Sequence, residues 1–428
     1  MQHCCIYDFK LINCFQNLNQ PDMIRTQTNL FRALLIILLL WGCSDSDDPL
    51  DKEHPENREY SFVRLLISNA DNSNLLFYTP STQDLEAFDI KHPKGSLYAS
   101  SSGRYALITH RDHNYVETFD SSIEAHGDHA HLSDAKVGGM YSNGNKPTHV
   151  KSKLGKFLVF NDGDGTLSIG RESKVGNSEE MRQIDLGLTA HHGAMAIFKN
   201  GNYAVTEKLG EPGGLPEQVI LIDSDGKKID GIEPIATPGI HGSASNDNTA
   251  VFGSISGVLI IHDNGQQEII SYPADFDKSW IGSLMSTYDA NKFIGAVRGK
   301  GLYTVDVAAK SISPLVMYDN IVKMAVSSDK KKLGLLLQDG TLVYFDLEDK
   351  SEIFSEKVID AIPEQQGHGH TSPNLTLSSK YAYISEPVKK ELLHVYLAKP
   401  SEIKKQELQH VPYSLVLLGA ELDNEGAH

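Results

Sequence analysis

The chain has 428 residues, and its 56 acidic residues against 39 basic residues give a formal net charge of −17 at pH 7. The phosphates of DNA and RNA would repel so acidic a chain, so its charge argues against nucleic-acid binding. All four cysteines lie before residue 44, which leaves the remainder without disulfides or thiol ligands.

The N-terminal region has the order of a bacterial lipoprotein signal. We expect translation to start at Met23, which makes residues 1–22 a misassigned start. From Met23, two arginines precede an apolar run at 33–41. This order is typical of a secretory signal peptide, here 23–42, and the run is short for a bilayer span. Cys43 resembles the lipidated first residue of a lipoprotein; the alternative, a transmembrane anchor, lacks a stop-transfer flank.

The residues after Cys43 predict a tether at the cell envelope. Residues 43–57 are polar, acidic and proline-containing, the composition of a flexible solvated linker. An acidic run directly after the lipidated cysteine resembles the surface-export signal of some bacterial lipoproteins. We therefore expect an outer-membrane lipoprotein anchored through Cys43, facing either the periplasm or the cell surface.

A repeat of short strands fills residues 58–420. Apolar segments alternate with turns rich in Gly, Asn, Asp and Ser, and no long helical pattern occurs. Seven units of turn, strand, turn and strand follow one another, as in SSGRYALITHRDHNYVETFD and KLGKFLVFNDGDGTLSIG. Their spacing of about 45 residues is that of the four-stranded blade of a β-propeller.

The two ends of this region complete an eighth blade. The segment SFVRLLISNADNSNLLFYTPSTQDLEAFDI supplies three strands, and VPYSLVLLGAEL supplies one. Pairing them closes the ring and removes an exposed sheet edge. We predict an all-β single propeller of eight blades, with seven as the alternative, closed by the C-terminal strand and followed by a tail at 421–428.

Several histidines share one phase of the repeat. They lie just before or at the start of a blade's innermost strand, in KPTHV, TAHHGAM, PGIHGSA and GHGHTSP: His149, His191, His192, His241 and His370. Innermost strands line the central channel and start on one face of the disc, so these side chains should converge. Four imidazoles at equal phase suit a tetrahedral zinc site. The alternative is a set of ordinary polar groups at strand starts.

Turns between second and third strands open on the same face. They bring in His110, Asp112 and His113 from THRDHNY, with Asp162 and Asp164 from NDGDG nearby. Zinc is the expected ion because imidazole dominates and cysteine is absent, while copper and nickel also accept such ligands.

The stretch HGDHAH contains His126, His129 and His131. It falls in a segment, 121–146, without a strand pattern, between the second and third blades. We predict that this segment enters the face of the inner-strand histidines and forms a mobile claw over their site, bending at Gly127. The alternative is a solvated linker without a ligand.

The histidine loop, PTHV, TAHHGAM and PGIHGSA followed by VFGSISGVLI resemble the AztD-type zinc metallochaperones, over most of residues 95–300. The resemblance implies a secreted propeller that holds Zn²⁺ on one face and hands it to the binding protein of a zinc ABC importer. It implies ligand roles for His126, His129, His131, His149, His192, His241 and His370. His110, Asp112 and His191 are expected either to contact these ligands or to serve as alternate ligands. The expected lipid anchor departs from the soluble, periplasmic members and leaves the identity of the acceptor open.

Two other functions stay open. A metal-dependent hydrolase such as a propeller lactonase would need a carboxylate-rich site with an open position for water, which the histidine excess disfavours. A scaffold propeller would carry these histidines incidentally. The sequence has no nucleophile elbow, phosphate loop or HExxH motif, so we predict a protein that is not an enzyme.

Overall fold

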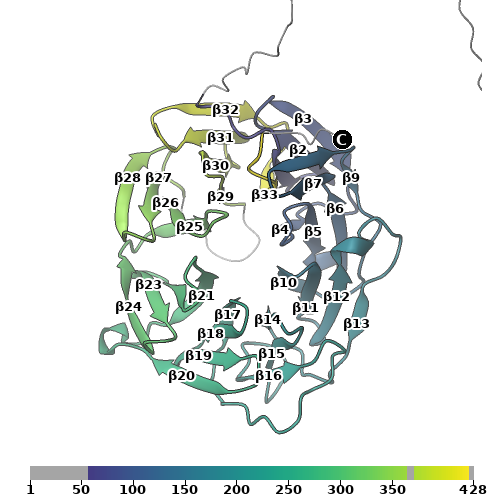
Figure 1. The fold of residues 1–428 in the computed structure, drawn as a ribbon, viewed down its shortest axis with the longest axis vertical. Helices are drawn as coiled ribbons and strands as arrows, with labels where there is room; N and C mark the ends of the chain where they lie inside the picture. Colours follow the sequence, from purple (N-terminus) through teal and green to yellow (C-terminus); the bar gives the residue numbers. More distant parts are fainter. Residues whose placement is uncertain (1–55, 364–370, 424–428) are drawn as a thin grey trace, which may run out of the picture. The chain divides into compact units, whose positions relative to one another are not determined.

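A computed structural model describes residues 56–363 and 371–423. The signal region, Cys43 and His370 lie outside these described residues. Among the described residues, eight sheets of three or four strands are arranged in a ring (Figure 1), and a ninth sheet is a two-stranded hairpin. The ring confirms the predicted eight-bladed all-β propeller. The helices of the described residues are three 3₁₀ turns, η1 (Arg111–His113), η2 (Glu172–Lys174) and η3 (Ala274–Phe276). None of them is long or apolar enough to cross a membrane.

The blades follow one another in chain order. The strands of each blade run from the channel outward in sequence order, except that the innermost strand of the first blade comes from the C-terminus. The first blade contains β1 (Val63–Asn69), β2 (Asn74–Thr79) and β3 (Asp84–Asp89). The second contains β4 (Ser96–Ala99), β5 (Tyr105–His110), β6 (Tyr115–Asp120) and β9 (Lys136–Val137). The third contains β10 (Pro147–Lys153), β11 (Lys156–Asn161), β12 (Thr166–Arg171) and β13 (Arg182–Ile184). The next two comprise β14 (Met195–Ile197), β15 (Tyr203–Glu207) and β16 (Gln218–Ile222); and β17 (His241–Ser245), β18 (Thr249–Gly253), β19 (Gly257–His262) and β20 (Gln267–Ser271).

The last three complete blades comprise β21 (Ile281–Ser286), β22 (Lys292–Val297), β23 (Gly301–Asp306) and β24 (Ser311–Val316); β25 (Ile321–Val326), β26 (Lys332–Leu337), β27 (Thr341–Asp346) and β28 (Ser351–Lys357); and β29 (Asn374–Leu377), β30 (Tyr381–Glu386), β31 (Glu391–Tyr396) and β32 (Ile403–Glu407). The C-terminal strand β33 (Pro412–Gly419) returns to the first blade as its innermost strand. It pairs antiparallel with β1 from Val63↔Gly419 to Asn69↔Pro412. Chain ends thus close the ring, as the sequence predicted.

The core lies between neighbouring blades. On β11, Phe157, Leu158, Val159 and Phe160 are all fully buried, because a middle strand is covered by another blade on each side of its sheet. Alternate residues enter different clusters: Leu158 and Phe160 pack with Met195 of the next blade. Each such side chain contributes roughly 1.5–3 kcal/mol on burial, so the ring of contacts holds the strand ends, and the side chains on them, in fixed positions.

Strand order fixes the two faces of the disc. We call the face on which innermost strands start, and on which second strands connect to third strands, the proximal face. On β10 and β11 the pair Pro147↔Asn161 marks this end, so His149 and the turn after Asn161 both lie there. The far end of each innermost strand marks the distal face.

The segment 121–146 differs from its prediction. Instead of an unpatterned linker between blades, it forms a hairpin of β7 (Ile123–His126) and β8 (His129–Leu132), followed by β9, the outer strand of the same blade. Within the hairpin, only Ile123 and Ala130 are buried apolar side chains, and they pack on Phe62. So few apolar positions leave almost no strand signal in the sequence.

The hairpin also lies on the opposite face from the one predicted. It follows Asp120, which pairs with Tyr105, whereas His110 at the other end of β5 pairs with Tyr115. Five residue steps at ~3.4 Å separate these ends by roughly 17 Å. Arg104 at the distal end forms ion pairs with Asp120 and Glu124. The expectation of a claw over the proximal site is therefore wrong.

Candidate metal centre

Three histidines from consecutive blades meet on the proximal face. His149 lies near the start of β10, His192 just before β14, and His241 at the start of β17. The Nε2 atoms of His149 and His192 are 3.1 Å apart. The ring centroid of His192 lies 4.6 Å from that of His149 and 5.2 Å from that of His241. We call these residues the tri-histidine centre; their convergence follows from their equal phase in the repeat.

The spacing of the rings approaches that of zinc ligands. Nitrogens at ~2.0–2.1 Å from a tetrahedral ion lie roughly 3.3 Å from one another, and their ring centroids roughly 5 Å apart. The centroids of His149 and His241 are wider, at 6.4 Å.

Two of the imidazoles have outer partners that orient them. His192 Nδ1 lies 2.8 Å from Asp162 Oδ2, and His241 Nδ1 donates to the Gly282 carbonyl at 2.6 Å. A carboxylate or carbonyl that accepts the Nδ1 proton leaves Nε2 as the free lone pair, the arrangement typical of metal-binding histidines. Both Nε2 atoms are therefore left with a lone pair that can bind a metal ion.

Burial lowers the pKa of His149, which leaves its ring able to bind a cation. Desolvation, with a smaller effect of His192, lowers the pKa of His149 to about 4, so its ring is neutral near pH 7 and retains a lone pair. Burial by itself opposes the charged form of Asp162, but the hydrogen bond and charge of His192, together with hydrogen bonds from Thr148 and the Gly193 amide, outweigh it, and the pKa of Asp162 is lowered. The pair His192–Asp162 thus combines a proton donor with a carboxylate that stays ionised.

Two rings of the centre are hydrogen-bonded to each other. Since His192 donates through Nδ1, its Nε2 accepts a hydrogen bond from His149 Nε2 in neutral rings. Within the described ranges, no three His, Cys, Asp or Glu side chains are placed to hold a metal ion as they stand. Binding would replace the His149–His192 hydrogen bond and move the His149 proton away from Nε2.

The centre opens into a cavity of about 1310 Å³. His192 and His241 line it, and so do three residues around η1 that the sequence placed on this face: His110, Asp112 and His113. The loop Pro212–Leu215, inserted before β16, closes another side. The cavity confirms that second-to-third-strand turns share the face of the inner-strand histidines.

The remaining predicted ligands on this face stand apart from the centre. His191 points into its blade, where Nδ1 lies 2.7 Å from the Thr189 carbonyl and Nε2 3.0 Å from Thr206 Oγ1. His110 is buried with Nε2 2.7 Å from Glu117. The side chain of Asp112 is 91% exposed on the cavity rim. None of the three contributes a nitrogen or oxygen to the centre, and His370 lies outside the described residues.

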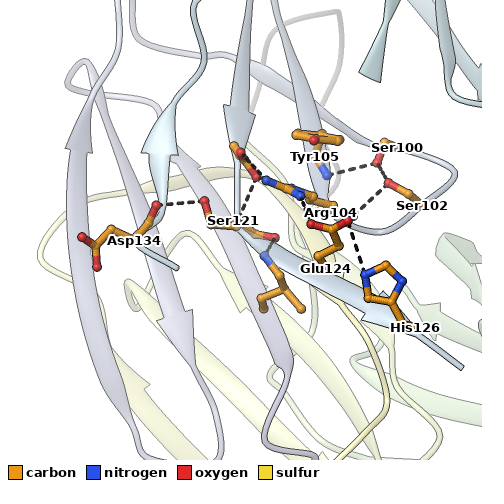
Figure 2. A network of polar contacts seen from close by, with 11 residues as sticks. Ser100, Ser102, Arg104, Tyr105, Ser121, Glu124, His126 and Asp134 are labelled. Carbon is orange, nitrogen blue, oxygen red and sulfur yellow. Dashed lines mark hydrogen bonds and ion pairs between the residues drawn. The ribbon is translucent and has the colours of Figure 1, made fainter. Parts of the chain in front are cut away.

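The hairpin histidines, His126, His129 and His131, form a separate cluster on the distal face. Their ring centroids are 5.3 to 6.0 Å apart. Figure 2 shows His126 beside Glu124, with Nε2 3.3 Å from Oε1, and Glu124 held by Arg104. The cluster brings three imidazoles together, as predicted, but in a place from which they do not reach the tri-histidine centre.

Sequence reasoning missed several neighbours of the centre. The ring of Trp280 stands edge to face with His241, at 6.1 Å between centroids. Arg111 lies beside Thr148 and Asp162, within 3.1 and 3.6 Å. Arg111 directly follows His110 in the motif THRDHNY, so its position in a turn on the proximal face could have been predicted from the sequence.

Comparison with known proteins agrees with this architecture. The scan against protein families finds no matching model. The chain is 23% identical over 355 residues to the zinc chaperone AztD of Citrobacter koseri, covering 80% of this chain and 83% of that protein. Two crystal structures of Citrobacter koseri AztD, one of them apo, superpose with TM-scores of 0.75 and 0.73.

Those two structures are 22% and 20% identical to the chain, cover 86% and 84% of it, and are themselves covered to 100% and 99%. A dihydro-heme d1 dehydrogenase, NirN, shares the fold more distantly, with a TM-score of 0.56 and 12% identity over 82% of this chain and 74% of its own. The resemblance to AztD-type proteins read from the sequence is thereby confirmed, together with the propeller fold.

Proposed function

We propose that this protein is a zinc chaperone: it binds Zn²⁺ at His149, His192 and His241 and releases it to an acceptor protein in the cell envelope. The convergence of three imidazoles from three blades, two of them oriented by Asp162 and the Gly282 carbonyl, carries this proposal. The likeness to zinc chaperone AztD supports it. The function is binding and delivery, without catalysis.

Zinc is the favoured ion because the ligands are imidazoles. They suit Zn²⁺ in tetrahedral geometry, and three of them leave a position from which an acceptor can take the ion. Copper and nickel also bind imidazole, so their exclusion depends on geometry. The expected acceptor is the binding protein of a zinc ABC importer, as the resemblance implies.

The positions of the carboxylates near the centre argue against a hydrolase. Asp162 is 8% exposed and accepts from His192, so it is not placed to activate a water. Asp112 extends into solvent from the rim. Metal-assisted hydrolysis needs a base that reaches the bound water, and neither carboxylate of the cavity offers one.

The hairpin histidines would bind a second ion more weakly. They are partly or largely exposed. His126 and His129 lie beside the carboxylates of Glu124 and Asp128, which a bound cation would have to share. Because they lie on the distal face, they would bind metal independently of the tri-histidine centre and would not cover it.

Metal analysis of tag-free protein tests the proposal. We expect about one tightly bound zinc per chain and a second, weaker equivalent. Transfer to an apo zinc-binding protein, followed by a fluorescent zinc indicator, tests delivery. A protein that retains no zinc after gel filtration would be a scaffold propeller instead. Membrane attachment through Cys43, which the sequence predicts, is tested by mass spectrometry of the N-terminal peptide from the membrane fraction.

A further inference from the structure

The cavity above the tri-histidine centre carries a positive charge in an acidic protein. Its lining contains the cations Lys94, Arg111 and Lys146 against the carboxylates Asp112 and Asp162. A divalent ion held by neutral imidazoles would add two further positive charges. Positive charge concentrated in a partly enclosed site is costly unless an anion balances it. The described lining offers no further carboxylate for that purpose.

The guanidinium of Arg111 is held beside the metal ligands. Its Nε donates to Thr148 Oγ1 at 3.1 Å, and one terminal nitrogen lies 3.6 Å from Asp162 Oδ2. Thr148 directly precedes His149 in the chain, and Asp162 orients His192.

Thr148 is itself fixed, because its carbonyl accepts a hydrogen bond from Tyr98. The Arg111 side chain lines the cavity and is 46% exposed, with its other terminal nitrogen 3.9 Å from Asp112 Oδ1, beyond hydrogen-bond distance. It therefore keeps N–H groups for a ligand next to the centre.

The volume of the cavity exceeds what an ion alone requires. A water molecule takes ~30 Å³ of liquid volume, and small-molecule sites take roughly 300–1,000 Å³. At about 1310 Å³, the space above His192 and His241 accommodates a small molecule together with the ion.

We propose that the tri-histidine centre binds its ion together with a small carboxylate anion, which completes the coordination and pairs with Arg111. One carboxylate oxygen occupies the fourth position on the ion, and the other accepts from the guanidinium, whose planar fork matches a carboxylate. This inference rests on the proposed function, because the anion joins an ion already held by His149, His192 and His241.

Cobalt-loaded protein provides the test, since the visible spectrum of Co²⁺ in a tetrahedral site changes with each ligand. Acetate and citrate are titrated separately into the loaded protein in a non-coordinating buffer. We expect a saturable spectral change, and for Arg111→Gln an anion dissociation constant raised by about tenfold or more, because a charge-assisted hydrogen bond is lost. The matched control is Arg298→Gln, an exposed arginine in the corresponding turn of another blade, which should behave as wild type.

The outcomes separate the two proposals. Failure to bind cobalt before any anion is added would contradict the proposed function itself. Cobalt binding with an unchanged spectrum, or equal anion affinity in wild type and Arg111→Gln, would overturn the co-ligand. Loss of cobalt to citrate after gel filtration would overturn it too, because the anion would then compete rather than complete the site. If citrate binds more tightly than acetate, the carboxylate comes from a small chelating acid. If acetate binds at least as tightly as citrate, a single carboxylate is enough, such as one on a side chain of the acceptor.

Discussion

Replacing Asp162 by asparagine tests how much the negative charge beside His192 contributes to metal binding. The asparagine side chain has nearly the same size and keeps an oxygen that accepts from His192 Nδ1, now 2.8 Å from Asp162 Oδ2, but it no longer makes the imidazole more basic. Substitution of such outer partners weakens metal binding by about 10- to 100-fold, which is roughly 1.4–2.7 kcal/mol. Because Asp162 is 8% exposed, solvent screening would reduce this effect little, and we expect a loss in the upper part of that range.

The matched control is Asp164→Asn in the same turn. Asp164 belongs to the same NDGDG motif, and its carboxylate accepts from Thr166 rather than from a histidine. Zinc affinity of both variants is measured by competition with a chromogenic chelator, and thermal unfolding verifies that both remain folded. If Asp162→Asn binds zinc within about twofold of Asp164→Asn, the orienting role of the carboxylate is refuted.

Three further outcomes are expected. Truncating His241 to alanine should lower zinc affinity in calorimetry by at least about 100-fold while circular dichroism stays unchanged, since one of three ligands is lost from a half-buried strand end; an affinity within tenfold of wild type would contradict the centre. Changing all three hairpin histidines to alanine should remove the weaker zinc equivalent and leave the tight one intact, and a weakened tight site would show that the two clusters communicate across the disc. Burial, with a smaller effect of Lys404, lowers the pKa of His394 to about 4, below its unfolded value near 6.5, so its contribution to stability is present above pH 6.5 and is lost as the pH falls toward 4. His394→Phe should therefore reduce the loss of unfolding free energy between pH 7 and 4.5 by at most about 3 kcal/mol, and identical pH profiles for both proteins in urea unfolding would argue against this linkage.

The sequence predicted the site best where position follows from the repeat. His149, His192 and His241 occupy equivalent places in three units, and equivalent places in a propeller point at one axis. The prediction failed where position depends on a short, irregular insertion. The hairpin histidines follow the third strand of a blade, but the outer strand that reveals this, β9, has only two residues, too few for a recognisable pattern.

Neighbouring residues show the limit of the same reasoning. His191 and His192 share one motif, and successive side chains of an extended segment point in opposite directions. Tertiary packing decides which one faces the channel. Thr206 and Phe160 enclose His191, while His192 is hydrogen-bonded to Asp162 and lies beside His149.

The sequence by itself determined the eight blades, the closure of the ring by the last strand, and the face on which the inner-strand histidines meet. These features follow from the period of the repeat and from the alternation of strand direction, which are properties of order along the chain. Only the tertiary structure decided that the hairpin histidines lie on the distal face, that His191 is buried away from the centre, and that Arg111 stands beside it. Those features depend on which side chains fill the space between blades, and that space is formed by residues far apart in the sequence.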